Sequence, residues 1–213
     1  MKNWRMWLVF AAILIAGISV YALVSSWQRP QPYEGTELSG LAPDFQLIDQ
    51  NGSSVSLSDF QGEVIVLTFM DSKCEDTCPL TAADFREAYR KLNQNEKNQI
   101  VFLGVNVNVE ASDASDVLEA TRQWHLDEIP NWHFLTGNRE ELEPVWMDYA
   151  VAVVPSPDGK EIMHTAGVYM IDPSGKERWY ISTPYSVDGN ADWTQPLSDL
   201  LLKHIREILN GNK

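Results

Sequence analysis

Residues 63–70, EVIVLTFM, constrain the fold more than any other part of the chain. The run is nearly all apolar and rich in β-branched residues, which is typical of a strand buried on both faces. A second run of the same kind covers residues 99–107, QIVFLGVNV. Because a strand buried on both faces needs helices on either side, these two runs predict an α/β protein built around a central sheet.

The remaining pattern extends this prediction. Apolar residues at helical spacing predict helices, and alternating or β-branched runs predict further strands. The helices are expected over residues 79–93, 115–124, 139–149 and 197–209, and the strands over 165–171 and 177–181. Asn51-Gly52 is a strong turn signal and predicts a β-hairpin that joins 44–48 to 54–57. The order of elements favours a thioredoxin-like α/β sandwich with an added N-terminal hairpin, over residues 44–213.

The first 30 residues read as a signal anchor. Residues 7–24 carry no charge and are mostly apolar, and about 18 such residues span most of a bilayer core as one helix. A cleaved signal peptide is the alternative, but its apolar core is usually about 7–15 residues long. Lys2 and Arg5 precede the segment and predict an N-terminus on the inner side. We therefore expect a single-pass membrane protein with a tether over 31–43 and its domain on the extracytoplasmic side.

The only two cysteines of the chain, Cys74 and Cys78, follow the first buried run in the sequence Cys-Glu-Asp-Thr-Cys-Pro. A disulfide that closes a loop of about five residues stabilises by only roughly 2 kcal/mol, so a purely structural bridge is a weak explanation. Pro79 is well tolerated in the first turn of a helix and disfavours helical geometry in the residue before it. We therefore expect Cys78 at the N-cap of the helix, Cys74 in the preceding loop, and both sulfurs near the positive helix end.

Two thiolates are soft ligands that favour Cu(I) or zinc, and imidazole can serve either ion as a third donor. A structural zinc site usually needs four ligands, whereas one cysteine pair is visible here. His164 is the best candidate for a third donor, because it precedes the strand over 165–171, whose leading loop would lie beside the dithiol. The neighbouring Met163 would then point away, as a core or rim residue. His125 and His133 lie in an apparent connector, and His204 is expected to be a solvated or otherwise satisfied surface residue.

With these features the chain resembles the Sco/SenC family of membrane-anchored, thioredoxin-fold copper proteins. These proteins serve assembly of the binuclear copper site of cytochrome c oxidase. The resemblance covers roughly residues 42–209. The motifs that carry it are Ala42-Pro43-Asp44-Phe45, residues 55–62 (VSLSDFQG), residues 74–79 (CEDTCP), and His164-Thr165 with residues 169–175 (YMIDPSG). The resemblance implies copper as the bound metal and Cys74, Cys78 and His164 as its ligands.

Three positions depart from the family's usual pattern. Glu75 stands where proline usually follows the first cysteine, and Met163-His164-Thr165 replaces Asp-His-Ser. The aspartate-rich turn expected after the second central strand reads Asn106-Val107-Asn108-Val109-Glu110. The missing acid beside the histidine removes a charge that could support a ligand or a docking partner.

The net charge is −14, and after the first 30 residues the chain carries 13 basic against 30 acidic side chains. Such a domain repels nucleic acid. The favoured hypothesis is a copper metallochaperone that passes its metal to the copper-bearing subunit of cytochrome c oxidase or to another copper protein. The alternative is a thiol-disulfide oxidoreductase that uses Cys74 and Cys78 as its redox dithiol, although the usual spacing for that chemistry is Cys-x-x-Cys. A membrane-spanning sensor and a peroxidase are weaker alternatives.

Overall fold

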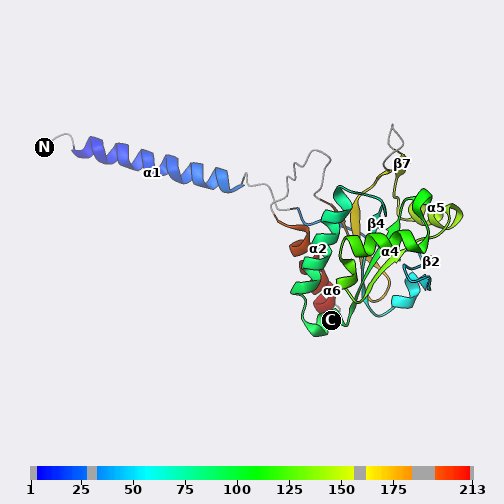
Figure 1. The fold of residues 1–213 in the computed structure, drawn as a ribbon. Helices are drawn as coiled ribbons and strands as arrows, with labels where there is room; N and C mark the ends of the chain where they lie inside the picture. Colours follow the sequence, from blue (N-terminus) through cyan, green and yellow to red (C-terminus); the bar gives the residue numbers. More distant parts are fainter. Residues whose placement is uncertain (1–3, 28–32, 156–161, 184–194, 212–213) are drawn as a thin grey trace. The chain divides into compact units, whose positions relative to one another are not determined.

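The computed structural model describes residues 4–27, 33–155, 162–183 and 195–211, and the chain divides into two compact units, Met1–Tyr33 and Glu34–Lys213. The first unit contains one helix, α1 (Trp4–Trp27), drawn in blue in Figure 1. Within the described residues, no helix is both long enough and apolar enough to cross a membrane. The structure therefore does not support the predicted membrane-spanning segment.

The second unit is built on a six-stranded sheet with the strand order β1-β10-β9-β4-β5-β6. Strands β4, β5 and β6 are parallel, whereas β9, β10 and β1 continue the sheet in antiparallel pairs. The strands of this sheet are β1 (Thr36–Glu37), β4 (Val64–Met70), β5 (Ile100–Asn106), β6 (Trp132–Leu135), β9 (Gly167–Ile171) and β10 (Glu177–Ser182). The two sequence runs that predicted buried strands form β4 and β5, and every residue of both is buried.

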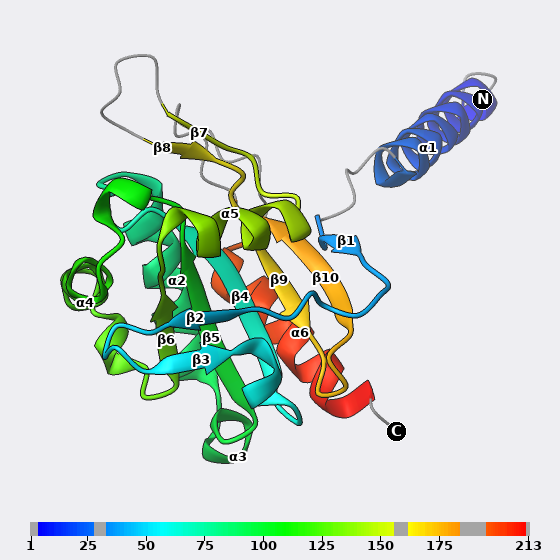
Figure 2. The same cartoon turned by 90° about the vertical axis from the view of Figure 1, so that its right-hand side faces the viewer.

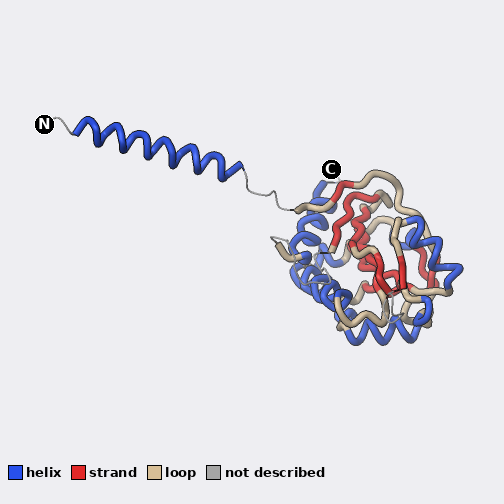
Figure 3. The backbone as a smooth tube through the Cα atoms, turned by 90° about the horizontal axis from the view of Figure 1, so that it is seen from above, coloured by secondary structure: helices blue, strands red, loops and turns tan. Residues whose placement is uncertain are grey.

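Helices cover both faces of this sheet, as expected of an α/β sandwich. The helices and 3-10 turns are η1 (Leu57–Phe60), α2 (Thr77–Lys91), α3 (Gln94–Lys97), η2 (Val109–Ala111), α4 (Ala114–Gln123), η3 (Leu126–Glu128), α5 (Arg139–Asp148) and α6 (Leu197–Gly211). Figure 2 shows α2 and α6 behind the sheet and α5 in front of it, with α4 beside the β6 edge. The view from above in Figure 3 shows the strands enclosed by helices and loops. The thioredoxin-like arrangement predicted from the sequence is thus present.

The predicted N-terminal hairpin is formed by β2 (Gln46–Ile48) and β3 (Ser54–Ser56) around Asn51-Gly52. Gly52 has φ +77°, a conformation that glycine adopts without the strain other residues would meet. The hairpin also closes the open edge of the sheet. The Gln50 side chain donates to the Trp132 carbonyl (3.1 Å) and accepts from the Phe134 N–H (2.8 Å), so it pairs main-chain groups of β6 that face no further strand.

Two parts of the sheet structure differ from the sequence-based expectation. Thr36–Glu37, in the stretch assigned to a tether, pairs with Trp179 and Tyr180 as β1. A second small hairpin, β7 (Val153–Pro155) and β8 (Ile162–His164), lies just before β9. Its three-residue strands, one of which contains a proline, are too short to leave a periodic pattern. The hairpin matters because β8 carries His164.

Candidate functional site

The dithiol lies where β4 ends and α2 begins. Cys74 is partly exposed in the connecting loop, and Cys78 is 4% exposed in the first turn of the helix. The helix starts at Thr77 with Asp76 as its N-cap, so the prediction that Cys78 is the N-cap was wrong. The reason is that the first-turn N–H groups of a helix have no intrahelical partner, so Pro79 costs no hydrogen bond two positions further in, as the third helical residue.

The two cysteines are free thiols that contact each other. The main-chain N–H of Cys78 donates to Cys74 Sγ at 3.4 Å, and the Thr77 hydroxyl lies 3.9 Å from the same sulfur. The start of α2 therefore turns its unpaired N–H groups toward Cys74, as anticipated from the strand-to-helix junction. The sequence placed these two side chains together correctly.

The two thiols differ in acidity. A hydrogen bond from the Cys78 thiol, together with N–H groups of Cys78, Asp76 and Thr77, lowers the pKa of Cys74 from 9.0 to about 5 despite partial burial. The hydrogen bond to Cys74 and burial raise the pKa of Cys78 well above 9.0. At neutral pH the pair is therefore one thiolate, Cys74, hydrogen-bonded by one thiol, Cys78. For Cys74 the hydrogen bonds to the thiolate therefore outweigh the burial that opposes ionisation.

A network of buried polar side chains hydrogen-bonds the loop that carries Cys74. Asp71 Oδ1 accepts hydrogen bonds from the Lys73 N–H (2.9 Å) and from Asn108 Nδ2 (2.8 Å). Asn106 Oδ1 accepts from the Ser72 N–H (3.3 Å), and the Ser72 hydroxyl donates to the Ala111 carbonyl (2.9 Å). The sequence singled out Asn106 and Asn108 only as a departure from the family pattern, and it did not point to Asp71 or Ser72. A signal for them was present, since polar side chains directly follow two buried strands that run parallel and side by side.

Lys73 is directed away from the sulfur that follows it. Its ammonium group pairs with Asp116 (2.9 Å) and Glu119 (3.1 Å) on α4, and these two acids raise its pKa. The hydrogen bonds that lower the pKa of Cys74 come from the Cys78 thiol and from main-chain N–H groups of residues 76–78, and not from this lysine. Lys73 therefore ties the dithiol loop to α4 rather than activating the thiol.

His164 is the last residue of β8 and pairs with Val153 of β7. It is half-buried, and its Nδ1 lies 3.0 Å from the Thr165 carbonyl. A carbonyl only accepts hydrogen bonds, so Nδ1 carries a proton and the lone pair of the neutral ring lies on Nε2, the atom free to bind a metal. In the described part of the chain, no group of three or more His, Cys, Asp or Glu side chains is arranged to hold a metal ion. The structure brings together two of the three predicted ligands, and the role of His164 stays a prediction.

The other histidines have structural surroundings. His204 is fully buried, so the expectation of a solvated residue was wrong, although its ring is fully hydrogen-bonded. Its two nitrogens lie 2.8 Å from Glu207 and 2.7 Å from the Glu34 carbonyl, and the ring packs on Trp179. Position 204 falls on the apolar face by which α6 packs, and this decides its burial.

His133 lies within β6, with Nδ1 3.3 Å from the buried Asp49 carboxylate, and His125 adopts a left-handed conformation before η3. Met163 is 52% exposed opposite Val154 in the β7–β8 hairpin, on the rim rather than in the core. None of these side chains joins the two cysteines.

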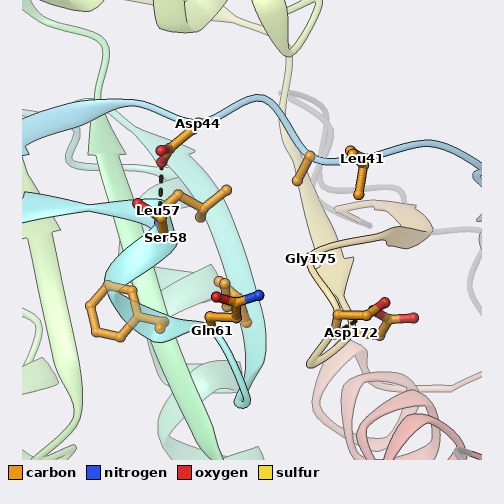
Figure 4. A pocket seen from close by; sticks show the side chains of 11 residues that line it. Leu41, Asp44, Leu57, Ser58, Gln61, Asp172 and Gly175 are labelled. Atoms are coloured by element: carbon orange, nitrogen blue, oxygen red, sulfur yellow. Dashed lines mark hydrogen bonds between the residues drawn. The ribbon is translucent and has the colours of Figure 1, made fainter.

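A pocket of about 200 Å³ lies at the other end of β4. It is lined by residues that include Leu57, Ile65 and Gly175, and Figure 4 shows the hydrogen bond from the Ser58 N–H to Asp44 at its rim. Ile65 is at the start of β4, whereas the cysteines follow its end. The pocket offers no sulfur or imidazole and is separate from the dithiol site.

The family model for SCO1/SenC matches residues 34–193, three quarters of the chain. The chain belongs to the SCO1/SenC family. Among curated relatives, the Bacillus subtilis SCO1 protein homolog is 28% identical over 134 residues, covering 62% of this chain and 68% of the relative. A SCO2-like protein of Rickettsia felis is 25% identical over 217 residues, covering 96% of this chain and 95% of the relative.

Solved structures agree with the fold of this SCO1/SenC protein. Apo Sco1 of Thermus thermophilus is 26% identical with a TM-score of 0.63, covering 82% of this chain and 95% of that structure. ScoI of Arabidopsis thaliana with copper bound is 24% identical with a TM-score of 0.64, covering 79% of this chain and 99% of that structure. The structural neighbours thus include Sco proteins with copper bound.

Proposed function

We propose that this protein is a copper metallochaperone that carries Cu(I) to a copper site of cytochrome c oxidase or of another copper protein. The observation that carries the proposal is the contact between Cys74 and Cys78 at the start of α2, in a chain of the SCO1/SenC family. A structural neighbour, BsSco, is described as a member of the Sco family of cytochrome c oxidase assembly proteins. Copper here is cargo, which the protein must hold and then release.

The donor set fits Cu(I). Two sulfurs supply the soft ligands that this ion prefers, and the Nε2 lone pair of His164 supplies a third donor. Cys74 is already a thiolate at neutral pH, so it can make the first bond to an arriving ion. Cys78 must lose its proton to make the second bond, and a cation beside it favours that loss. A three-coordinate site of this kind leaves room for a recipient's ligand to displace one donor at a time.

The test is an anaerobic Cu(I) titration of the reduced protein against a competing chelator. Wild type is compared with His164→Ala and with the matched control His125→Ala, which removes a histidine from the η3 turn. One copper per chain, held at least about tenfold more weakly in His164→Ala and normally in His125→Ala, is the expected result. Equal affinity in all three proteins would refute the three-ligand site. A wild type unable to compete with the chelator would refute copper carriage.

A second candidate function, thiol-disulfide exchange, is favoured by the unequal acidity of the two thiols. The Cys74 thiolate would attack a partner disulfide, forming a mixed disulfide and releasing one partner thiolate. Cys78 would then give up its proton and attack Cys74 Sγ, which releases the second partner thiolate. The product is a Cys74–Cys78 disulfide, and the partner disulfide is reduced by two electrons. Catalysed reduction of a model disulfide by the reduced protein, abolished in Cys74→Ser, is the expected result for this function.

We also propose that the domain works outside the cytoplasm. The relatives and neighbours include proteins named as mitochondrial and as a lipoprotein. Disulfides form and persist in oxidising compartments outside the cytoplasm, so a dithiol that is oxidised and reduced in its working cycle is suited to such a location. Fusion of a reporter that is active only outside the cytoplasm to the C-terminus of the full chain tests this location. Activity of a cytoplasm-specific reporter at the same position would contradict it.

A further inference from the structure

Asp71 and Asn108 form a buried pair beneath the dithiol. Asp71 is 4% exposed and Asn108 is 8% exposed, and Asn108 Nδ2 donates to Asp71 Oδ1 at 2.8 Å. Asp71 is the first residue after β4, and Asn108 follows β5, whose last residue lies opposite Met70 in the parallel register. The pair therefore links the two chain segments that leave neighbouring strands at the functional end of the sheet.

Asp71 contacts the dithiol segment at three points. Its carboxylate accepts the Lys73 N–H at 2.9 Å, and its main-chain carbonyl accepts the Cys74 N–H at 3.0 Å. Its main chain also hydrogen-bonds the sulfur of Cys78. The orientation of Asp71 consequently sets where the Lys73–Cys74 peptide lies relative to Cys78, and with it the contact between the two sulfurs.

Asn108 fixes the orientation of Asp71, because hydrogen bonds determine which way the side-chain amide of Asn108 points. Its Oδ1 accepts the Glu110 N–H at 3.0 Å, so its Nδ2 must be the atom that faces Asp71. The main chain of Asn108 is held in turn by Asn106, which accepts the Asn108 N–H (3.1 Å) and donates to the Asn108 carbonyl (3.0 Å). Only a side chain with an acceptor on one side and a donor on the other satisfies this position. A carboxylate at position 108 would set two acceptors against each other.

We propose that Asn108, acting through Asp71, is the positioning residue that keeps Cys74 and Cys78 in contact in the reduced, metal-free protein. The inference deepens the proposed function, because it concerns how the same dithiol is made ready for a metal or a partner sulfur. Asn108 contacts neither sulfur in this role. It orients the Asp71 carboxylate, and Asp71 in turn hydrogen-bonds the loop that carries Cys74.

The experiment is a double-mutant cycle in the full-length chain: Asn108→Asp, Asp71→Asn and the double variant. Because Asp71 Oδ1 accepts from both the Lys73 N–H and Asn108 Nδ2, an amide at position 71 can present its oxygen or its nitrogen at that point and cannot replace both contacts. The double variant therefore measures whether the effects of the two substitutions are coupled. Asn95→Asp is the matched control, because it adds the same charge at an exposed position of α3, at the opposite end of the sheet.

The readout is the equilibrium constant between the dithiol and its disulfide in a glutathione buffer, measured without metal. We expect Asn108→Asp to shift this constant by at least about tenfold, the double variant to shift it by clearly less than the product of the two single shifts, and Asn95→Asp to leave it unchanged. An unchanged constant in Asn108→Asp would overturn the proposal. So would a double variant that folds and shifts the constant by the full product of the two single shifts, because the two residues would then act independently.

If Asn108→Asp does not fold, Asn108→Ser replaces it, since serine lacks the amide nitrogen that donates to Asp71 and adds no charge. The same tenfold shift is expected, and a wild-type constant in folded Asn108→Ser would overturn the proposal. The measurement also separates the two hypotheses. A wild type that carries no copper but shows the coupling refutes only the metallochaperone function, whereas unchanged constants in a protein that binds copper refute only the positioning role.

Discussion

The hydrogen bond from Cys78 to Cys74 makes a prediction that two conservative variants can separate. Cys78→Ser keeps a hydroxyl that can donate to the Cys74 thiolate, whereas Cys78→Ala removes the donor. Because that hydrogen bond is the largest cause of the lowered pKa of Cys74, its pKa should stay low in the serine variant. In the alanine variant the pKa should rise toward the ordinary value of 9.0, held below it by the N–H groups of α2.

The size of the pKa shift is visible in how the rate of thiol modification changes with pH, and not in the rate at a single pH. With a pKa of about 5, the thiolate fraction of Cys74 changes by only about 1.1-fold between pH 6 and pH 8, whereas a thiol of pKa 9.0 gains nearly 100-fold. A drop of about four pKa units also lowers intrinsic nucleophilicity by roughly 40- to 100-fold, which offsets most of the gain in thiolate at pH 7. Absolute rates of modification at neutral pH would therefore mislead.

The assay is alkylation of the reduced protein by iodoacetamide at several pH values, with mass spectrometry to confirm that the label is on Cys74. Wild type and Cys78→Ser should give flat profiles between pH 6 and pH 8, and Cys78→Ala a rising one. A wild-type rate that increased about tenfold for each pH unit would show an ordinary thiol and refute the argument from hydrogen bonding. Equal, flat profiles in all three proteins would assign the acidity to the helix N–H groups alone.

Three further predictions concern the frame that holds the site. A Cβ at Gly167 would clash with the Tyr180 ring, so Gly167→Ala should destabilise by about 1–3 kcal/mol in urea unfolding. In a Tyr180→Ala background the same substitution should cost much less, and an equal cost in both backgrounds would contradict the clash. Gln50→Leu removes both hydrogen bonds to β6 and should cost about 1–3 kcal/mol in the same measurement; stability equal to that of wild type would contradict its role at the sheet edge. His204→Phe keeps a ring against Trp179 but removes the hydrogen bonds to the Glu34 carbonyl and to Glu207, so unfolding should be about 0.5–1.5 kcal/mol easier, and an unchanged midpoint would show that the histidine hydrogen bonds contribute nothing net.

The central part of the fold was predictable because its signals are local and strong. Continuous β-branched runs gave β4 and β5 to within a residue or two, and Asn51-Gly52 gave the hairpin of β2 and β3. Strands β1, β7 and β8 were not predictable. Each is two or three residues long and takes its structure from a partner strand, so no period can develop in the sequence.

In the candidate site, the proximity of the two cysteines was predictable, whereas their hydrogen-bonded connection to the polar residues Asp71 and Asn108 was not. Asp71 and Asn108 are ordinary polar residues in sequence, and their importance depends on the parallel register that places the ends of β4 and β5 side by side. His204 shows the opposite case. Its spacing from Leu197, Leu200 and Leu201 puts it on the buried face of α6, but an assignment from residue type alone placed it at the surface.

The unequal thiols also connect the two candidate functions, because both begin at the Cys74 thiolate and differ in what removes the proton from Cys78. In exchange, that proton leaves after Cys74 has bonded to a partner sulfur. In metal binding, it leaves as Cys78 becomes a ligand.

Cu(I) binding at pH 7 should therefore release about one proton per metal from the two sulfurs, whereas two ordinary thiols of pKa 9.0 would release about two. Titration of the protons released in weakly buffered solution, with Cys78→Ser as the variant that should release almost none, distinguishes these cases. Release of two protons by wild type would mean that Cys74 binds copper from its thiol form. The difference in protonation between Cys74 and Cys78 inferred from the structure would then be wrong.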